Sequence, residues 1–183
     1  MVFKDTILTF EDDKIITDDD REVMMSWESP IMEKSAEYIC ESKGDILEIG
    51  FGMGICSDYI QSQDVNSHTI VEIHPQIIEK LKVWADDKDN VTIVEGDWNS
   101  VDLNKTYDGI FLDTFADDSL DNFKEFAIAK AKSGTKITYW NNFADTRNKY
   151  SFDDINFEEV SVSPSSNGYT KIVDTYYMPK VEL

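Results

Sequence analysis

Short apolar runs alternate with amphipathic stretches through the middle of the chain. The runs are too short for helices and indicate buried strands; they lie at residues 46–49, 68–73, 91–94, 107–112 and 135–140. Between them, apolar side chains recur at helical spacing in residues 55–60, 75–85 and 120–131. The last of these helices is predicted to be capped by residues 117–119 and to end at Gly134. Because strands that alternate with helices form parallel sheets covered on both faces, the pattern predicts an α/β fold with a mostly parallel sheet.

The two ends of the chain differ from this middle part. Residues 6–10 and 14–17 are β-prone and flank an acidic turn, which predicts a hairpin. Residues 21–27 are predicted to form a short helix, and Pro30 suits the first turn of the helix that follows. Near the other end, residues 158–162 and 169–177 predict an antiparallel hairpin that closes one edge of the sheet.

The length of 183 residues favours a single domain. We divide it into an N-terminal segment that covers the site (1–44), a cofactor-binding core (45–142) and the C-terminal hairpin (143–183).

A glycine-rich turn follows the first predicted strand of the core. Gly50, Gly52 and Gly54 alternate with apolar residues just before the predicted helix, so the backbone can approach a ligand near free helix amides. The spacing does not give the Gly-x-Gly-x-x-Gly pattern of hydride-transfer enzymes. Glu48-x-Gly50-x-Gly52-x-Gly54 is instead similar to the first motif of S-adenosylmethionine-dependent methyltransferases, although a purely structural turn would also explain the glycines.

Acidic and aromatic residues end the next two predicted strands, at the sheet edge where ligands bind in open α/β folds. Glu72, followed by Ile73, stands roughly 20 residues after the glycines, where an acid binds ribose hydroxyls. Asp97 is placed to accept from an adenine amine, and Trp98 to pack on the ring. The glycine loop has no lysine or arginine for a phosphate, which argues against nucleoside triphosphates.

The composition narrows the range of partners. The formal net charge is −20 and the chain has no basic stripe, so we expect no nucleic-acid partner and favour cationic ones. Solubility or a salty habitat would explain the acidity equally well.

No apolar run approaches the roughly 20 residues of a membrane span, and we expect no membrane partner. Cys40 and Cys56 lack a metal-type spacing, so we expect free thiols and a cytoplasmic location. The sequence leaves monomer and homodimer open.

Several motifs together resemble the guanidinoacetate methyltransferase family and the related arginine N-methyltransferases. They are Met24-Met25-Ser26-Trp27-Glu28, the glycine turn, Glu72, Gly96-Asp97-Trp98 and Asp113-Thr114-Phe115. The resemblance implies a class I methyltransferase fold, S-adenosylmethionine as cofactor and a small guanidino or other cationic amine as substrate. It further implies cofactor contacts from Met24, Met32, Glu48, Gly50, Phe51, Gly52, Gly54, Glu72, Ile73, Asp97, Trp98 and Asp113, and substrate contacts from Glu28 and Asp113.

The chain departs from the family pattern at three places. Ser26 replaces an arginine, and Phe143 and Ala144 stand where the family has a hydroxyl pair that holds the substrate carboxylate. Arg147 is a candidate replacement for that pair, with a surface role as the alternative. These departures weaken the case for guanidinoacetate itself.

Two carboxylates are the candidates for the chemistry. A guanidinium has a pKa above about 12.5, and its nitrogen proton becomes acidic only as the methyl group arrives. We assign Asp113 as the acceptor of that proton and Glu28 as the second half of a bidentate clamp on the guanidinium. Both carboxylates are expected to be ionised at neutral pH, because a bound cation favours the charged form. The alternatives are a strand-end cap for Asp113 and an exposed turn acid for Glu28.

Two other functions remain open from the sequence. Asp113 with Asn141 and Asn142 could supply oxygen ligands to Mg²⁺ in a catechol-type O-methyltransferase, whereas our assignment needs no metal. A protein that binds the cofactor without turnover is the non-enzymatic alternative.

Overall fold

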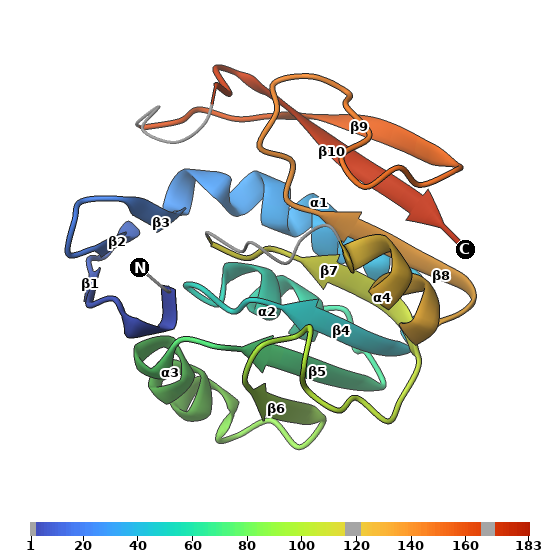
Figure 1. Ribbon diagram of the computed structural model, residues 1–183, viewed down its shortest axis with the longest axis horizontal. Helices are drawn as coiled ribbons and strands as arrows, with labels where there is room; N and C mark the ends of the chain where they lie inside the picture. Colours follow the sequence, from blue (N-terminus) through green and yellow to red (C-terminus); the bar gives the residue numbers. More distant parts are fainter. Residues whose placement is uncertain (1–2, 116–121, 166–170) are drawn as a thin grey trace.

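A seven-stranded sheet forms the centre of the computed structural model, which describes residues 3–115, 122–165 and 171–183 (Figure 1). The strand order is β6-β5-β4-β7-β8-β10-β9. The strands are β4 (Asp45–Ile49), β5 (Ser67–Glu72), β6 (Val91–Glu95), β7 (Tyr107–Leu112), β8 (Ala131–Tyr139), β9 (Ile155–Ser161) and β10 (Thr175–Glu182). Strands β4 to β8 pair in parallel, and β10 pairs antiparallel with both β8 and β9. The mostly parallel sheet and the C-terminal hairpin at its edge confirm the predicted fold class.

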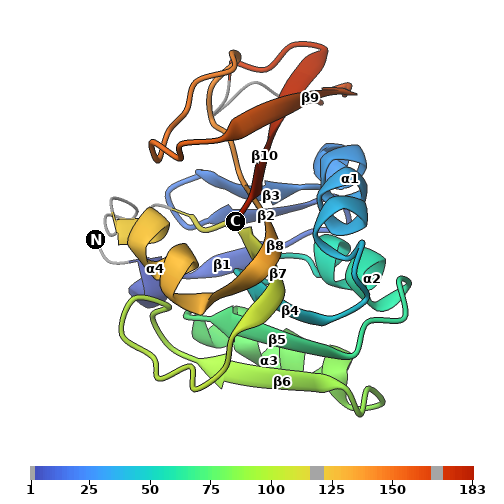
Figure 2. The same ribbon diagram turned by 90° about the vertical axis from the view of Figure 1, so that its right-hand side faces the viewer.

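Helices pack on both faces of this sheet. They are α1 (Ser29–Ile39), α2 (Ile55–Gln61), α3 (Pro75–Ala85) and α4 (Phe123–Lys130). Helices α1 and α2 lie together on one face and α4 on the other (Figure 2). Each face therefore has its own apolar core: Ile46 packs with the α1 side, whereas Leu47 and Ile110 pack with the α4 side. In the described part of the chain, no helix combines the length and apolar character of a membrane span.

A second, three-stranded sheet precedes α1. It contains β1 (Leu8–Phe10), β2 (Lys14–Thr17) and β3 (Glu22–Met25), all antiparallel. The predicted N-terminal hairpin is confirmed, but the predicted helix over residues 21–27 is wrong. That segment forms β3 and the short 3₁₀ helix η2 (Ser26–Glu28) instead. Backbone pairing with β2 and burial of two methionines outweigh the helical propensity of methionine there.

Two predicted boundaries also need correction. Gly134 does not end α4, because the helix ends at Lys130 and Gly134 lies inside β8. Its φ of +82° and the register shift opposite Tyr107 show an irregular strand start that alternation does not reveal. The C-terminal hairpin forms, with its second strand running on to Glu182. The helix caps expected at residues 117–119, and Leu120, lie outside the described residues.

Candidate functional site

The glycine turn connects β4 to α2 and brings two strand ends together. Gly50, Gly52 and Gly54 have φ values of +92°, +55° and +78°, which side chains other than glycine rarely adopt. A Cβ on Gly50 would lie 1.8 Å from the carbonyl oxygen of Asp113, so only glycine lets the turn pass this closely. The turn therefore places the β4 and β7 ends side by side.

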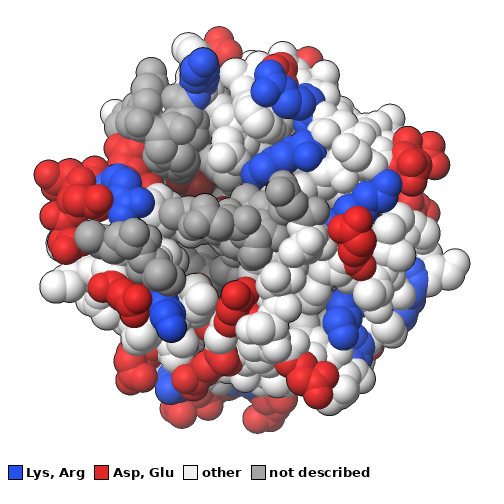
Figure 3. Space-filling model, in the orientation of Figure 1, with Lys and Arg blue, Asp and Glu red and all other residues white. Residues whose placement is uncertain are grey.

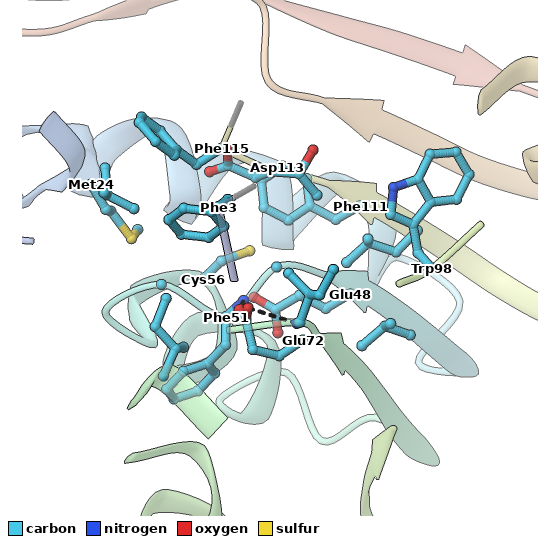
Figure 4. Close-up of a pocket in the computed structure, with 18 of the residues that line it drawn as sticks. Phe3, Met24, Glu48, Phe51, Cys56, Glu72, Trp98, Phe111, Asp113 and Phe115 are labelled. Carbon is cyan, nitrogen blue, oxygen red and sulfur yellow. Dashed lines mark hydrogen bonds between the residues drawn. The ribbon is translucent and has the colours of Figure 1, made fainter. Parts of the chain in front are cut away.

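A cavity of about 390 Å³ opens at these strand ends, a size usual for small-molecule sites (Figure 4). The predicted residues that line it are Met24, Met32, Glu48, Gly50, Phe51, Gly52, Glu72, Ile73, Asp97, Trp98 and Asp113. Gly54 and Glu28 are not among the lining residues. Gly54 shapes the turn, since its amide donates to the Phe51 carbonyl and it precedes α2.

Glu72 ends β5 and binds the glycine turn directly. Its buried carboxylate accepts from the amides of Phe51, Ile73 and His74 at 2.8–2.9 Å. Burial raises the pKa of this carboxyl, and the backbone amides partly offset that rise. The acid therefore orders the loop, and its position in the cavity wall leaves it available to a ligand hydroxyl.

Asp97 and Trp98 lie after β6, at one end of the cavity. The indole of Trp98 is buried and packs edge-on against Phe126 of α4, with ring centroids 4.9 Å apart. Asp97 is half-buried and accepts from the amide of Asn99 at 2.9 Å. Met24 lies at the opposite end of the cavity from Trp98 (Figure 4).

Glu48 lines the cavity and is held by hydrogen bonds to two other side chains. The side chain is fully buried, and its Oε2 accepts from Ser57 Oγ at 2.6 Å and contacts His68 Nε2 at 2.8 Å. Its Oε1 is buried without a hydrogen-bond partner among the described residues. A buried carboxylate oxygen without a partner is costly, so this atom is suited to a hydrogen-bond donor on a ligand.

Asp113 follows β7, across the cavity from Glu48 and Glu72 (Figure 4). Burial, followed by the negative charge of Glu48, raises the pKa of this carboxyl to about 7, while Lys149 acts in the opposite direction. Together with Asp97, four acids line this cavity, and they favour a cationic ligand, which would relieve their mutual repulsion.

Glu28 lies in the 3₁₀ helix η2 and is buried, which rules out the exposed turn acid considered above. Its Oε1 accepts from the amide of Met25 at 3.0 Å. Burial raises the pKa of the Tyr176 hydroxyl, and the negative charges of Asp113 and Glu28 add to that rise. Asp113 lines the cavity, whereas Glu28 lies outside the cavity wall.

Methionine sulfur and an N-terminal aromatic complete the cavity. The sulfur of Met24 accepts from the amide of Met53 at 3.1 Å, and Met32 is fully buried. Phe3, which sequence reasoning missed, packs on His74 and on Phe115 at centroid distances of 4.9 and 5.0 Å. No local pattern could reveal Phe3, because only the tertiary path of the first residues brings it there. Cys56, read only as a free thiol, also lines the cavity and is indeed free.

Two side chains predicted to act after β8, Asn141 as a metal ligand and Arg147 as a substrate anchor, have other partners. The Asn141 amide donates to the carbonyls of Asp145 and Tyr177, and its oxygen accepts from the Phe143 amide. Arg147 pairs with Asp145 at 3.1 Å and lies over the Phe143 ring. Neither side chain is therefore free to hold a ligand in this arrangement.

The parallel sheet, the glycine turn and the cavity at the strand ends define a Rossmann-like class I methyltransferase fold. Solved structures agree with this class. The N-methyltransferase NodS from Bradyrhizobium japonicum, in complex with S-adenosylhomocysteine, matches with a TM-score of 0.68 at 12% identity, over 85% of this chain and 87% of that one. Spermidine synthase from Thermotoga maritima matches with a TM-score of 0.69 at 13% identity, over 96% and 72%.

Sequence comparison gives the family. The profile described as guanidinoacetate N-methyltransferase matches residues 6–174, and the chain belongs to this family, which confirms the resemblance. Protein arginine N-methyltransferase 2 from Aspergillus oryzae is 31% identical over 96% of this chain and 48% of its own length. The Saccharomyces cerevisiae protein of the same name is 39% identical over 63% of this chain and 31% of its own length. The chain thus spans about half or less of these relatives.

Proposed function

We propose that this chain is an S-adenosylmethionine-dependent N-methyltransferase that acts on a guanidino group or another cationic amine. The observation that carries the proposal is Asp113, a half-buried residue just after β7 whose carboxyl faces Glu48 and Glu72 across one cavity. Family membership supports the same reaction class, and the relatives are named for arginine N-methylation.

The order of the strand ends fits the shape of the cofactor. From one side of the cavity to the other, β6 offers Asp97 and Trp98, β5 offers Glu72, and β4 and β7 offer Glu48 and Asp113. Adenine, ribose and the methionyl part follow one another in the same order along S-adenosylmethionine. Adenine would bind at Trp98, the ribose hydroxyls at Glu72, and the ammonium group at the free Oε1 of Glu48.

The remaining chemistry belongs to the carboxylates of the chain. Bound S-adenosylmethionine supplies a methyl group on a positively charged sulfur. Asp113 would orient the substrate nitrogen toward that methyl group and accept its proton as the new N–C bond forms. Glu28, which lies outside the cavity wall, would bind the far side of a guanidinium once the segment around η2 has closed on the substrate.

Arginine side chains are the substrates that the relatives' names favour, and the missing carboxylate anchor agrees with them. An arginine residue in a peptide has no free carboxylate near its guanidinium, so Phe143 and Ala144 need not replace the family's hydroxyl pair. The catechol-type alternative is weaker, because the oxygen of Asn141 already accepts from a backbone amide.

A methyl-transfer assay tests the proposal directly. The purified chain is incubated with labelled S-adenosylmethionine and either arginine peptides, free guanidino compounds or catechols, with and without a chelator. We expect transfer to a guanidino nitrogen that survives the chelator and falls roughly 10²- to 10⁴-fold in Asp113→Asn. Transfer to a catechol that requires Mg²⁺, or cofactor binding with no acceptor in any class, would contradict it.

A further inference from the structure

A buried polar network lies behind the cavity, where the mechanism does not use it. Its centre is His68 of β5, a fully buried side chain. His68 Nε2 lies 2.8 Å from Glu48 Oε2, and its Nδ1 lies 3.1 Å from Gln61 Nε2. Ser57 donates to the same Oε2 at 2.6 Å, so His68 and Ser57 both bind one oxygen of the Glu48 carboxylate.

The fold aligns these side chains. Strands β4 and β5 run parallel with Ile46 opposite His68, so Glu48 lies two residues further along and on the same face of the sheet. Ser57 and Gln61 are four residues apart on α2, which places them on one side of that helix. Two strands and one helix face thus fix the geometry of the carboxylate.

The hydrogen-bond roles follow from the chemistry of the groups. The amide nitrogen of Gln61 only donates, so Nδ1 of His68 accepts that hydrogen bond. The imidazole hydrogen is then on Nε2, which donates it to Glu48 Oε2. Because Oε2 is occupied, the only atom of this carboxylate left for a ligand is Oε1, which has no partner among the described residues.

We propose that His68 is a positioning residue: its Nε2 hydrogen bond to Oε2 turns the free Oε1 of Glu48 toward the amino group of the bound cofactor. The inference rests on the proposed function and goes beyond it, because it assigns a role to a residue outside the cavity wall. A purely structural histidine would stabilise the fold without discriminating between ligands, whereas a positioning histidine affects only ligands that carry the amino group.

Two ligands and a matched pair of variants separate these roles. S-adenosylhomocysteine carries the amino acid part, and 5′-methylthioadenosine keeps the nucleoside thioether without it. In His68→Gln the amide nitrogen reaches the position of Nε2, whereas in His68→Asn it is one bond too short. Calorimetry on the full chain gives the ratio of the two affinities for each variant, with Tyr38→Phe as a control that loses a buried hydrogen bond far from the cavity.

We expect His68→Asn to lower the preference for S-adenosylhomocysteine by roughly tenfold or more, and His68→Gln to keep it within about threefold. Tyr38→Phe should leave it unchanged, and His68→Asn should have no further effect in a Glu48→Gln background. An equal loss in Asn and Gln variants, or no loss in either, would overturn the inference.

Other outcomes separate this inference from the proposed function. If the folded wild type binds neither ligand, the proposed function fails first. If Glu48→Gln abolishes the preference and His68→Asn does not, only the role of His68 fails. Should His68→Asn not fold, nitrogen NMR of the wild-type imidazole decides: the Nε2–H tautomer supports the inference, and Nδ1–H overturns it.

Discussion

At the scale of single residues, Asp113 combines burial with the charge of a neighbouring acid. With a pKa of about 7, this carboxyl is protonated in roughly half of the molecules at neutral pH. The sequence-based expectation of full ionisation assumed a bound cation. Such a cation would lower the pKa of Asp113 again, so substrate binding itself would generate the proton acceptor.

The stability of the free protein should report this pKa. Because folding raises the pKa from 3.8 to about 7, the folded state binds more protons in that window, and the free energy of unfolding falls as pH rises through it. Asp113→Asn lacks this titration. Its melting temperature should therefore rise relative to that of the wild type as the pH increases from 4 to 8. Each kcal/mol corresponds to roughly 2–4 °C in a chain of this size.

Thermal unfolding across pH checks this prediction, with Asp153→Asn as the control, since that carboxylate is exposed. A gap between Asp113→Asn and the wild type that stays constant with pH would contradict it. The same variant should be nearly inactive, so stability and turnover would change in opposite directions.

At the scale of elements, the sequence predicts the central parallel strands well and the N-terminal sheet less well. The apolar runs and glycines place β4 to β8 in order, because a buried parallel strand is apolar along its whole length. The polar residues at their ends, Glu72 and Asp97, consequently line the cavity as expected. Strand β3 was missed because its pairing with β2 is decided by tertiary contact, and no period marks Val23-Met24-Met25 as a strand.

The residues of the site were likewise predictable in the central sheet and not in the N-terminal segment. Residues at strand ends were predictable, whereas Phe3 reaches the cavity through the path of the N-terminal segment. His68 was read only as part of a buried strand, since nothing in its neighbours announces a contact with Glu48. That contact depends on the parallel register of β4 and β5.

The glycine turn gives a prediction with an internal control. Gly50 and Gly134 both have positive φ, but a Cβ on Gly50 would meet the Asp113 carbonyl, whereas none of the described atoms lies within 4 Å of a Cβ on Gly134. Gly134→Ala should therefore cost only the conformational strain, roughly 1–2 kcal/mol. Gly50→Ala should cost clearly more and move Asp113. Urea unfolding of both variants tests this, and equal losses would contradict it.

At the scale of the whole molecule, charge is the dominant feature. The chain carries a net charge of −20, and exposed acids gather over the β1–β2–β3 sheet, at the left of the face in Figure 3. They include Glu11, Asp12, Asp13, Asp18, Asp19 and Asp20. The β2–β3 end of this sheet leads through Met24 to the cavity, so a long cationic substrate would meet negative charge on its way to Asp113.

Salt should therefore separate long substrates from short ones. An arginine-rich peptide would interact with the cavity and with the acidic surface, whereas a blocked single arginine would interact with the cavity alone. Raising the salt from about 50 to 500 mM shortens the screening length from roughly 14 to 4 Å, which weakens exposed charge interactions much more than buried ones. We expect kcat/KM for the peptide to fall steeply with salt and kcat/KM for the single arginine to change little.

Replacing the acids at 18–20 by asparagine should make kcat/KM for the peptide less dependent on salt and leave kcat/KM for the single arginine unchanged. Parallel salt profiles for the two substrates in the wild type would show instead that the acidic surface has no part in recognition.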